Sequence, residues 1–157
     1  MRKIAVLYYS MSGNTKELAE RVASIMTDSL PSDVSVELIR LSAVKREETP
    51  MIDGAYDAYL IGTFTWGKGE VHDQAQRFFV KNISVLRSTP VYYFGTGDTQ
   101  FGGDELFCNA LDVLNSKVPT DYDLLKVEQS VRGSQEQLVY DWCTNLARIL
   151  KRRWRNE

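Results

Sequence analysis

The residues best suited to bind a ligand stand near the start of the chain, in the run Ser10-Met11-Ser12-Gly13-Asn14-Thr15. A buried strand is predicted just before this run and an amphipathic helix just after it. The first N–H groups of a helix lack partners, and the helix dipole adds about half a positive charge there. The hydroxyls supply more donors, and Gly13 permits a backbone shape that a side chain would forbid. We therefore predict a phosphate site here, in preference to a simple helix cap.

Two later loops are also rich in glycine and hydroxyl side chains, and both follow predicted strands. Residues 63–69 carry Trp66 between small residues, and residues 95–103 carry Asp98 and Phe101. A phosphate site at one end and two aromatic rings at the other suit a flat, phosphorylated ligand. FMN fits this description better than a nucleoside triphosphate, because the chain has no Gly-Lys-Ser/Thr loop.

The elements that must position these loops alternate between strand and helix. We predict strands over residues 3–9, 34–39, 58–63, 90–95 and 124–127. Helices are predicted over residues 14–30, 71–83 and 105–117, and a last one after Gly133 with an apolar face of Leu138, Trp142, Leu146, Ile149 and Leu150. Residues 42–57 are predicted to form a polar connection, with room for a short helix. This alternation predicts an α/β fold with a parallel sheet covered on both sides, whose ligands bind beyond the carboxyl ends of the strands.

Length and composition restrict the class of protein. A chain of 157 residues is expected to form one domain, residues 1–157. The formal net charge of −2 gives no general attraction to nucleic acid or to an anionic membrane, and no apolar run is long enough to cross a bilayer. Cys108 and Cys143 are far apart, so we expect buried free thiols, no metal site and a cytoplasmic location.

Three motifs in order carry a resemblance to a known family. They are Tyr9 to Thr15, Ile61 to Gly67, and Gly95 to Asp98 followed by Phe107-Cys108. Along nearly its whole length the chain resembles the short-chain flavodoxins. This resemblance implies a three-layer flavodoxin-like sandwich with strand order 2-1-3-4-5. It also implies non-covalent FMN, no catalysis of its own, and low-potential one-electron transfer between a reductase and acceptor proteins. We expect a monomer.

The resemblance also assigns cofactor-binding residues. By this resemblance, the residues expected to bind the FMN phosphate are Ser10, Met11, Ser12, Gly13, Asn14 and Thr15. It carries the inner edge and face of the flavin ring to Thr63, Phe64, Thr65, Trp66 and Gly67, with Lys68 beside them. The pyrimidine edge of the flavin is assigned to Gly95, Gly97 and Asp98. The other predicted cofactor-binding residues are Thr96, Phe101 and Phe107.

Two positions depart from the family pattern. Phe101 stands where the family usually places a tyrosine on the outer flavin face, and Gly102, Gly103 and Asp104 lengthen this loop. Lys68 stands where close relatives commonly have an acidic residue. One charge at about 6–8 Å, in an effective dielectric near 20, is worth roughly 2 kcal/mol. We therefore expect Lys68 to make the potential of the second reduction step less negative than in acidic relatives.

Other functions stay open at this point. A displaced Phe101 would leave room for the substrate of an NAD(P)H:quinone oxidoreductase. A flavodoxin-like activator of ribonucleotide reductase is a further alternative, and a non-flavin binding module on the same fold is another. His72 is the only histidine and has no evident nucleophilic partner, so we expect it at the surface or at a helix start. The basic run over residues 151–155 is interpreted as a solvated helix end, and docking of an acidic partner is the alternative.

Overall fold

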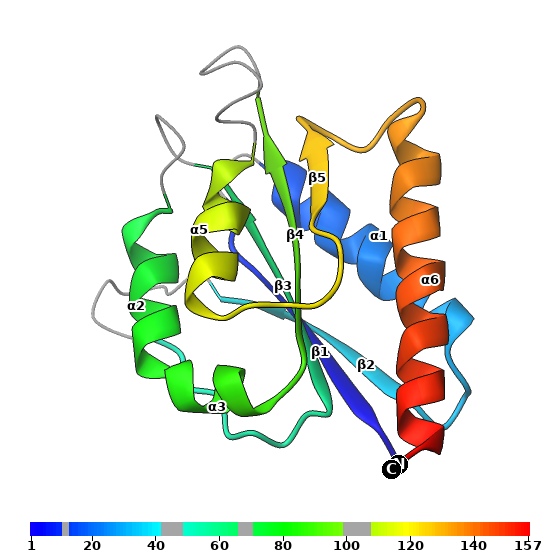
Figure 1. Ribbon diagram of the computed structural model, residues 1–157. Helices are drawn as coiled ribbons and strands as arrows, with labels where there is room; N and C mark the ends of the chain where they lie inside the picture. The colour runs from blue at the N-terminus through cyan, green and yellow to red at the C-terminus, as the bar shows by residue number, and fades with distance from the viewer. Residues whose placement is uncertain (11–12, 42–48, 66–70, 99–107) are drawn as a thin grey trace.

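A five-stranded parallel sheet forms the centre of the structure (Figure 1). The computed structural model describes residues 1–10, 13–41, 49–65, 71–98 and 108–157. The strands are β1 (Lys3–Tyr8), β2 (Ser35–Arg40), β3 (Ala58–Phe64), β4 (Val91–Gly97) and β5 (Leu125–Glu128). They lie in the order β2-β1-β3-β4-β5, and every pair is parallel. The predicted order 2-1-3-4-5 is confirmed.

Helices cover both faces of this sheet, as predicted. Helices α1 (Asn14–Ser29) and α6 (Gln135–Arg155) pack on one face. Helices α2 (Asp73–Lys81), α3 (Ile83–Ser88) and α5 (Asn109–Lys117) pack on the other. Along β1, Ile4 and Val6 face the first layer while Ala5 and Leu7 face the second. Because both faces are covered, the inner strands are continuous apolar runs rather than alternating ones.

Two helix predictions need correction, and a third concerns a start that lies outside the described residues. Instead of one helix over residues 71–83, α2 ends at Lys81 and a separate α3 follows. Helix α5 is described from Asn109, whereas its start was predicted at Glu105, which lies outside the described residues. Leu138 and Ile149 do not join the apolar face of α6, being 47% and 40% exposed. Consecutive residues lie about 100° apart around a helix. The residue that follows each of these two faces the sheet, so Leu138 and Ile149 themselves point away from it.

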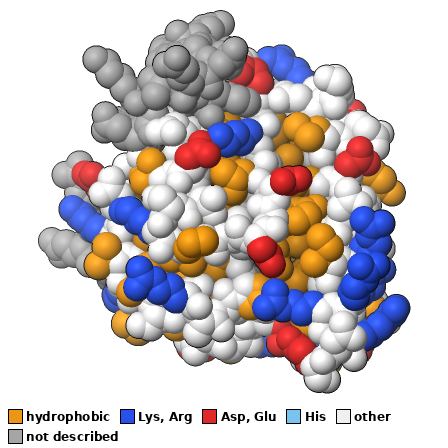
Figure 2. All heavy atoms as spheres, viewed as in Figure 1, with side chains coloured by type: hydrophobic (Ala, Val, Ile, Leu, Met, Phe, Trp, Pro, Cys, Tyr) orange, Lys and Arg blue, Asp and Glu red, His pale blue; other side chains and the backbone are white. Residues whose placement is uncertain are grey.

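The first layer ends in a basic surface near the chain termini. Arg2 forms an ion pair with Glu157 at 2.7 Å, which places the two termini side by side (Figure 1). The last turn of α6 carries Arg152, Arg153 and Arg155, and Figure 2 shows Lys and Arg side chains along this helix. The described helices include none with the length and apolar character needed to cross a membrane.

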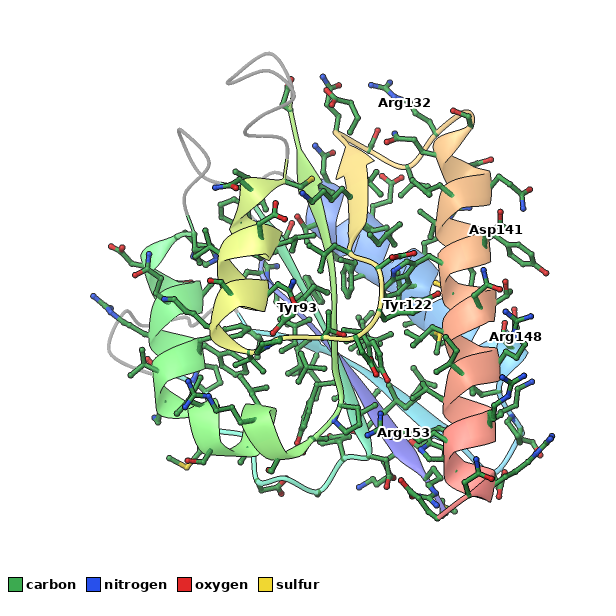
Figure 3. The ribbon with its side chains drawn as sticks, viewed as in Figure 1. Tyr93, Tyr122, Arg132, Asp141, Arg148 and Arg153 are labelled. Carbon is green, nitrogen blue, oxygen red and sulfur yellow. The ribbon has the colours of Figure 1, made fainter. Side chains whose placement is uncertain are left out.

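Aromatic side chains fill the space between the sheet and its helices. Figure 3 shows Tyr93 and Tyr122 on opposite sides of β4. The Tyr93 hydroxyl donates to the Val118 carbonyl at 2.6 Å, and the Tyr122 hydroxyl donates to the Trp142 carbonyl at 2.7 Å. These hydrogen bonds attach the segment that follows α5 to β4 and to α6.

Candidate functional site

The start of α1 lies beyond the carboxyl end of β1. Gly13 precedes the helix with φ 94°, a left-handed conformation that favours glycine. The Ser10 hydroxyl accepts hydrogen bonds from the N–H groups of Gly13 at 3.2 Å and Lys16 at 3.3 Å. Gly13 is the capping residue of α1 and has no side chain that could accept a hydrogen bond from the N–H groups of the first turn. The turn therefore presents helix N–H groups and hydroxyls at the positive end of a helix dipole.

A pair of buried hydroxyls joins α1 to β4. Thr15 Oγ1 and Thr96 Oγ1 lie 2.8 Å apart, and the two residues are 1% and 4% exposed. A pair of hydroxyls holds two protons and uses one of them in its mutual hydrogen bond. The second proton remains for an acceptor placed beside the pair. The contact links residues 81 positions apart in the chain and connects two of the three predicted loops.

The ends of β3 and β4 are held together by backbone and side-chain hydrogen bonds. The Thr65 N–H donates to the Thr96 carbonyl at 3.2 Å, and the Ala110 N–H donates to Thr65 Oγ1 at 3.2 Å. A Cβ built on Gly95 would lie 2.5 Å from the carbonyl oxygen of Thr63. Glycine is therefore required where the two strands approach each other.

An aromatic stack packs against the carboxyl end of β3. The Phe64 ring lies on the His72 ring with a centroid distance of 4.6 Å and an interplanar angle of 7°. Tyr9 meets the same imidazole edge-on at 4.7 Å. Burial lowers the pKa of His72, and the Asp73 charge opposes this effect. The buried Nε2 of His72 has no hydrogen-bond partner, so the neutral ring serves packing at the start of α2, as expected of a helix-start residue.

The exit of β4 is connected to the segment after β5. The Gln129 N–H donates to the Gly97 carbonyl at 2.7 Å, and its side-chain amide donates to Asp98 Oδ2 at 3.2 Å. Gln129 has φ 55°, and Arg132 in turn donates to its side-chain oxygen at 3.1 Å. This chain of polar contacts holds the Asp98 carboxylate at the edge of the sheet.

The Cys108 thiol is buried behind the same edge. It lies at the start of α5 with φ 50° and donates to the Gly95 carbonyl at 3.7 Å. Burial raises the pKa of this thiol to about 12, against a smaller lowering by its contact with the Val127 carbonyl. A thiol with this pKa is a structural group rather than a nucleophile. Both cysteines are free and buried, which confirms the prediction made for them.

The described site residues meet at one edge of the sheet, and the others lie outside the described residues. The described ones are Ser10, Gly13, Asn14, Thr15, Thr63, Phe64, Thr65, Gly95, Thr96, Gly97 and Asp98. Those outside are Met11, Ser12, Trp66, Gly67, Lys68, Phe101 and Phe107. Sequence reasoning missed the supporting role of Gln129, and it did not predict the contacts that His72 and Cys108 make. Gln129 and Cys108 have left-handed backbone conformations, which no local sequence signal predicts.

The donor set fits a phosphorylated ligand. Its described members at the start of α1 are neutral hydroxyls and backbone N–H groups, which bind an anion when they are fixed in place. Among the described residues, no group of three or more His, Cys, Asp or Glu side chains is arranged to hold a metal ion. The single described carboxylate among the predicted residues, Asp98, directly follows the end of β4.

Comparisons with known proteins agree on one family. Residues 6–119 match the family described as flavodoxin. "Probable flavodoxin 2" of Bacillus subtilis is 28% identical over 155 residues, which cover 94% of this chain and 96% of that protein. "Probable flavodoxin 1" of the same organism is 32% identical and covers 73% of this chain and 67% of its own length.

Solved structures give the same fold. Oxidised flavodoxin 1 from Bacillus cereus has a TM-score of 0.75 at 22% identity and covers 93% of this chain and 97% of its own. Oxidised flavodoxin 2 from the same organism has a TM-score of 0.64 at 28% identity and covers 92% of this chain and 94% of its own. The first comparison supports the fold. The second shows the same fold in a protein whose sequence identity to this chain is higher.

Proposed function

Because the chain belongs to the flavodoxin family, we propose that it binds FMN without a covalent bond and carries single electrons between a reductase and acceptor proteins. Flavodoxins are electron-transfer flavoproteins and not enzymes, so the family favours this function over a quinone oxidoreductase or a ribonucleotide reductase activator. When bound, FMN supplies the redox chemistry, and the protein supplies binding, orientation and electrostatics.

The start of α1 is the proposed phosphate site. The first-turn N–H groups and the hydroxyls of Ser10 and Thr15 would hold the phosphate, together with Ser12 from the same run. The proposal uses the helix dipole and neutral donors in place of a lysine or arginine in the turn. Ser10 already accepts two N–H groups of this turn, so its own hydroxyl proton is free to point at an anion.

The ends of β3 and β4 are the proposed site of the flavin ring. Residues 63–67 would line its inner edge and face, and residues 95–98 would line its pyrimidine edge. Trp66 and Phe101 are the proposed stacking residues, and Lys68 is the proposed nearby charge. The Phe64–His72 stack supports this assignment, because it fixes the described start of the 63–67 segment against α2.

The observation that carries the proposal is the hydrogen bond between Thr15 and Thr96. It joins the proposed phosphate site to the proposed ring site through two buried side chains. A ligand with an anionic tail and a flat head needs both sites at a fixed separation. An isolated helix cap needs no such connection to β4.

Titration of the flavin-free protein with FMN tests the proposal. We expect quenching of FMN fluorescence at a ratio of one FMN per chain, and tight binding that riboflavin, which lacks the phosphate, does not match. The purified holoprotein should oxidise NADPH rapidly only when a separate reductase is added. Equal affinity for FMN and riboflavin would contradict the phosphate assignment, and rapid oxidation of NADPH without a reductase would contradict the carrier function.

We further propose that residues 1–157 act as one domain and as a monomer in the cytoplasm. Support comes from the two apolar clusters, which share one sheet, and from the two free, buried cysteines. Sedimentation of the holoprotein at several concentrations measures the oligomeric state, with one species of a single chain's mass as the expected result.

A further inference from the structure

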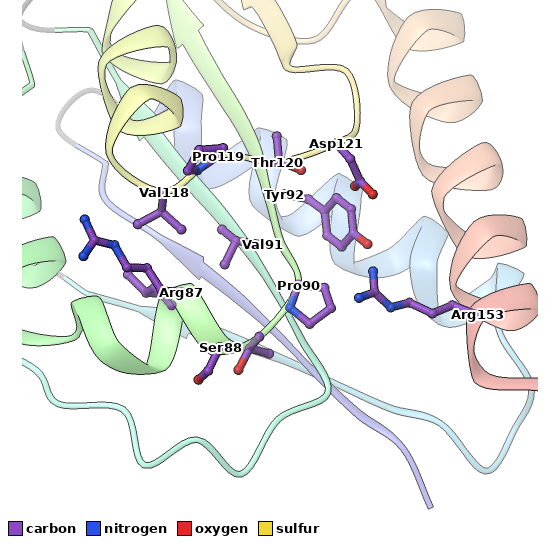
Figure 4. Close-up of a pocket in the computed structure, with 12 residues that line it drawn as sticks. Arg87, Ser88, Pro90, Val91, Tyr92, Val118, Pro119, Thr120, Asp121 and Arg153 are labelled. Atoms are coloured by element: carbon purple, nitrogen blue, oxygen red, sulfur yellow. The ribbon is translucent and has the colours of Figure 1, made fainter. Parts of the chain in front are cut away.

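A pocket of about 380 Å³ lies at the opposite end of the sheet from the proposed FMN site. Its walls come from the end of α3, the start of β4, the segment after α5 and the last turns of α6 (Figure 4). Leu86, Val91 and Val118 are buried and apolar. Pro90 and Pro119 extend the apolar lining. This pocket is separate from every residue assigned to the cofactor.

A buried hydroxyl without a partner lines this pocket. Tyr92 is 1% exposed, and its hydroxyl has no hydrogen-bond partner. The ring meets the Tyr122 ring edge-on at a centroid distance of 5.9 Å. Buried polar groups nearly always have a partner, so the Tyr92 hydroxyl is a donor that a water molecule or a bound ligand would satisfy.

A guanidinium group faces this hydroxyl. In Figure 4 the side chain of Arg153 extends from α6 toward the Tyr92 hydroxyl. Burial raises the pKa of Tyr92. The positive charge of the Arg153 guanidinium and its approach to the Tyr92 hydroxyl lower this pKa, but the contact falls short of a well-formed hydrogen bond. No ion pair within 4.0 Å is found for Arg153 among the described residues. An acceptor between the two groups would satisfy both of them.

The charges of the lining select a monoanion. Arg87 and Arg153 are cationic and Asp121 is anionic, which leaves a net charge of +1. A phosphate dianion would exceed this charge, and Asp121, which also raises the pKa of Tyr92, would repel a dianion more strongly than a monoanion. A carboxylate carries one charge and matches a planar guanidinium beside a hydroxyl donor.

We propose that this pocket binds a small organic carboxylate, with its charged end between the Tyr92 hydroxyl and the Arg153 guanidinium. Its apolar body lies against the proline and valine side chains of the wall. Small-molecule sites have this composition, a mainly apolar lining with a few polar groups that fix orientation. The proposal is independent of the FMN site.

Benzoate is the probe for this site, and benzamide is its uncharged control. The FMN-bound protein, labelled with ¹³C in its tyrosine rings, is titrated with each compound by NMR at constant ionic strength. We expect saturable shifts of the Tyr92 ring with benzoate and at least about tenfold weaker binding of benzamide. Equal binding of the two probes, or no saturable shift with benzoate, would overturn the proposal.

Two variants and one matched control locate the contact. Tyr92→Phe keeps the ring packed and should weaken benzoate binding about tenfold, measured by shifts of backbone amides that line the pocket. Arg153→Gln should reduce it at least as much. Arg152→Gln removes the same charge from the neighbouring position, which does not line the pocket, and should leave binding within twofold. A loss with Arg152→Gln equal to that with Arg153→Gln would show general attraction of anions and would refute the site.

Discussion

The hydroxyl pair of Thr15 and Thr96 allows a quantitative test of the connection between the two halves of the proposed cofactor site. The perturbation is a double-mutant cycle in the FMN-free protein, with Thr15→Val, Thr96→Val and the double variant. Valine keeps the branched shape of threonine and removes only the hydroxyl. Each single variant leaves the other hydroxyl buried, because the two residues are 1% and 4% exposed.

The structure sets the size of the expected coupling. A buried hydroxyl that loses its partner costs about 1–3 kcal/mol, whereas replacing both partners with apolar groups of the same shape is nearly neutral. The two single variants should therefore each lower the free energy of unfolding by about 1–3 kcal/mol. The double variant should lose no more than one of them, which gives a coupling energy of at least about 1–3 kcal/mol.

Urea denaturation monitored by far-ultraviolet circular dichroism measures these free energies. Thr27→Val is the matched control, since Thr27 lies on the same helix and its hydroxyl donates to the Ala23 carbonyl at the exposed surface. It lies about 18 Å along the helix from Thr15, at 1.5 Å per residue, so its effect should add to that of Thr96→Val within about 0.5 kcal/mol. If the losses in Thr15→Val and Thr96→Val also add within that margin, the two hydroxyls are not coupled and the reasoning fails.

Three further outcomes are expected. Burial lowers the pKa of His72 below 6.5, so the unfolded chain takes up a proton first, and the parent protein should lose stability as pH falls below about 6.5. The loss is at most about 1.4 kcal/mol per pH unit; His72→Phe should lack this part of the pH dependence in urea denaturation, and identical profiles would refute it. A Cβ on Gly95 would lie 2.5 Å from the Thr63 carbonyl, so Gly95→Ala should cost about 1–3 kcal/mol and weaken FMN binding in fluorescence titrations; an unchanged midpoint of unfolding would contradict this. Lys68→Asp should make the potential of the second reduction step more negative in spectroelectrochemistry, while Lys117→Asp, the same charge change at the end of α5, should not; an unchanged potential would show that Lys68 has little influence on the flavin.

The alternation of strands and helices and the two helix layers were predictable because they depend on patterns local to each element, whereas the strand order came from the resemblance to the short-chain flavodoxins. Strand β1 is a continuous apolar run, and the apolar positions of α1 recur at helical spacing. Parallel strands require crossover connections, and the helices between them supply these. The positions of the three loops at one edge followed from the same rule, and their described parts do meet there.

The division between α2 and α3 was not predictable, since it depends on contacts distant in sequence. Asn82 ends α2 and precedes α3, and its side chain is only 3% exposed. Its amide donates to the carbonyls of Pro50 and Phe78, and its oxygen accepts the Ile52 N–H. The asparagine thus binds a segment 30 residues away, which no helical periodicity records.

The supporting contacts of the candidate site escaped prediction for a similar reason. Each member of the Phe64–His72 stack is ordinary in its local sequence, and only the return of the chain after residue 70 brings the rings together. The Thr15 hydroxyl was predicted to bind phosphate, but its contact with Thr96 requires the register of the whole sheet. Sequence motifs identify candidate ligand contacts, whereas packing decides how those contacts are held.

The threonine anchors of the proposed site are neutral, and this allows the effects on FMN affinity and on redox potential to be separated. The hydroxyl pair of Thr15 and Thr96 and the hydrogen bonds of Thr65 would position a ligand without adding net charge. Weakening them should reduce FMN affinity similarly in every redox state, which leaves the potentials nearly unchanged. A charged residue such as Lys68 acts differently on differently charged states, and by linkage a difference in affinity between redox states is a shift in potential. The threonine variants should therefore change mainly the dissociation constant of FMN, and the Lys68 variant mainly the potential.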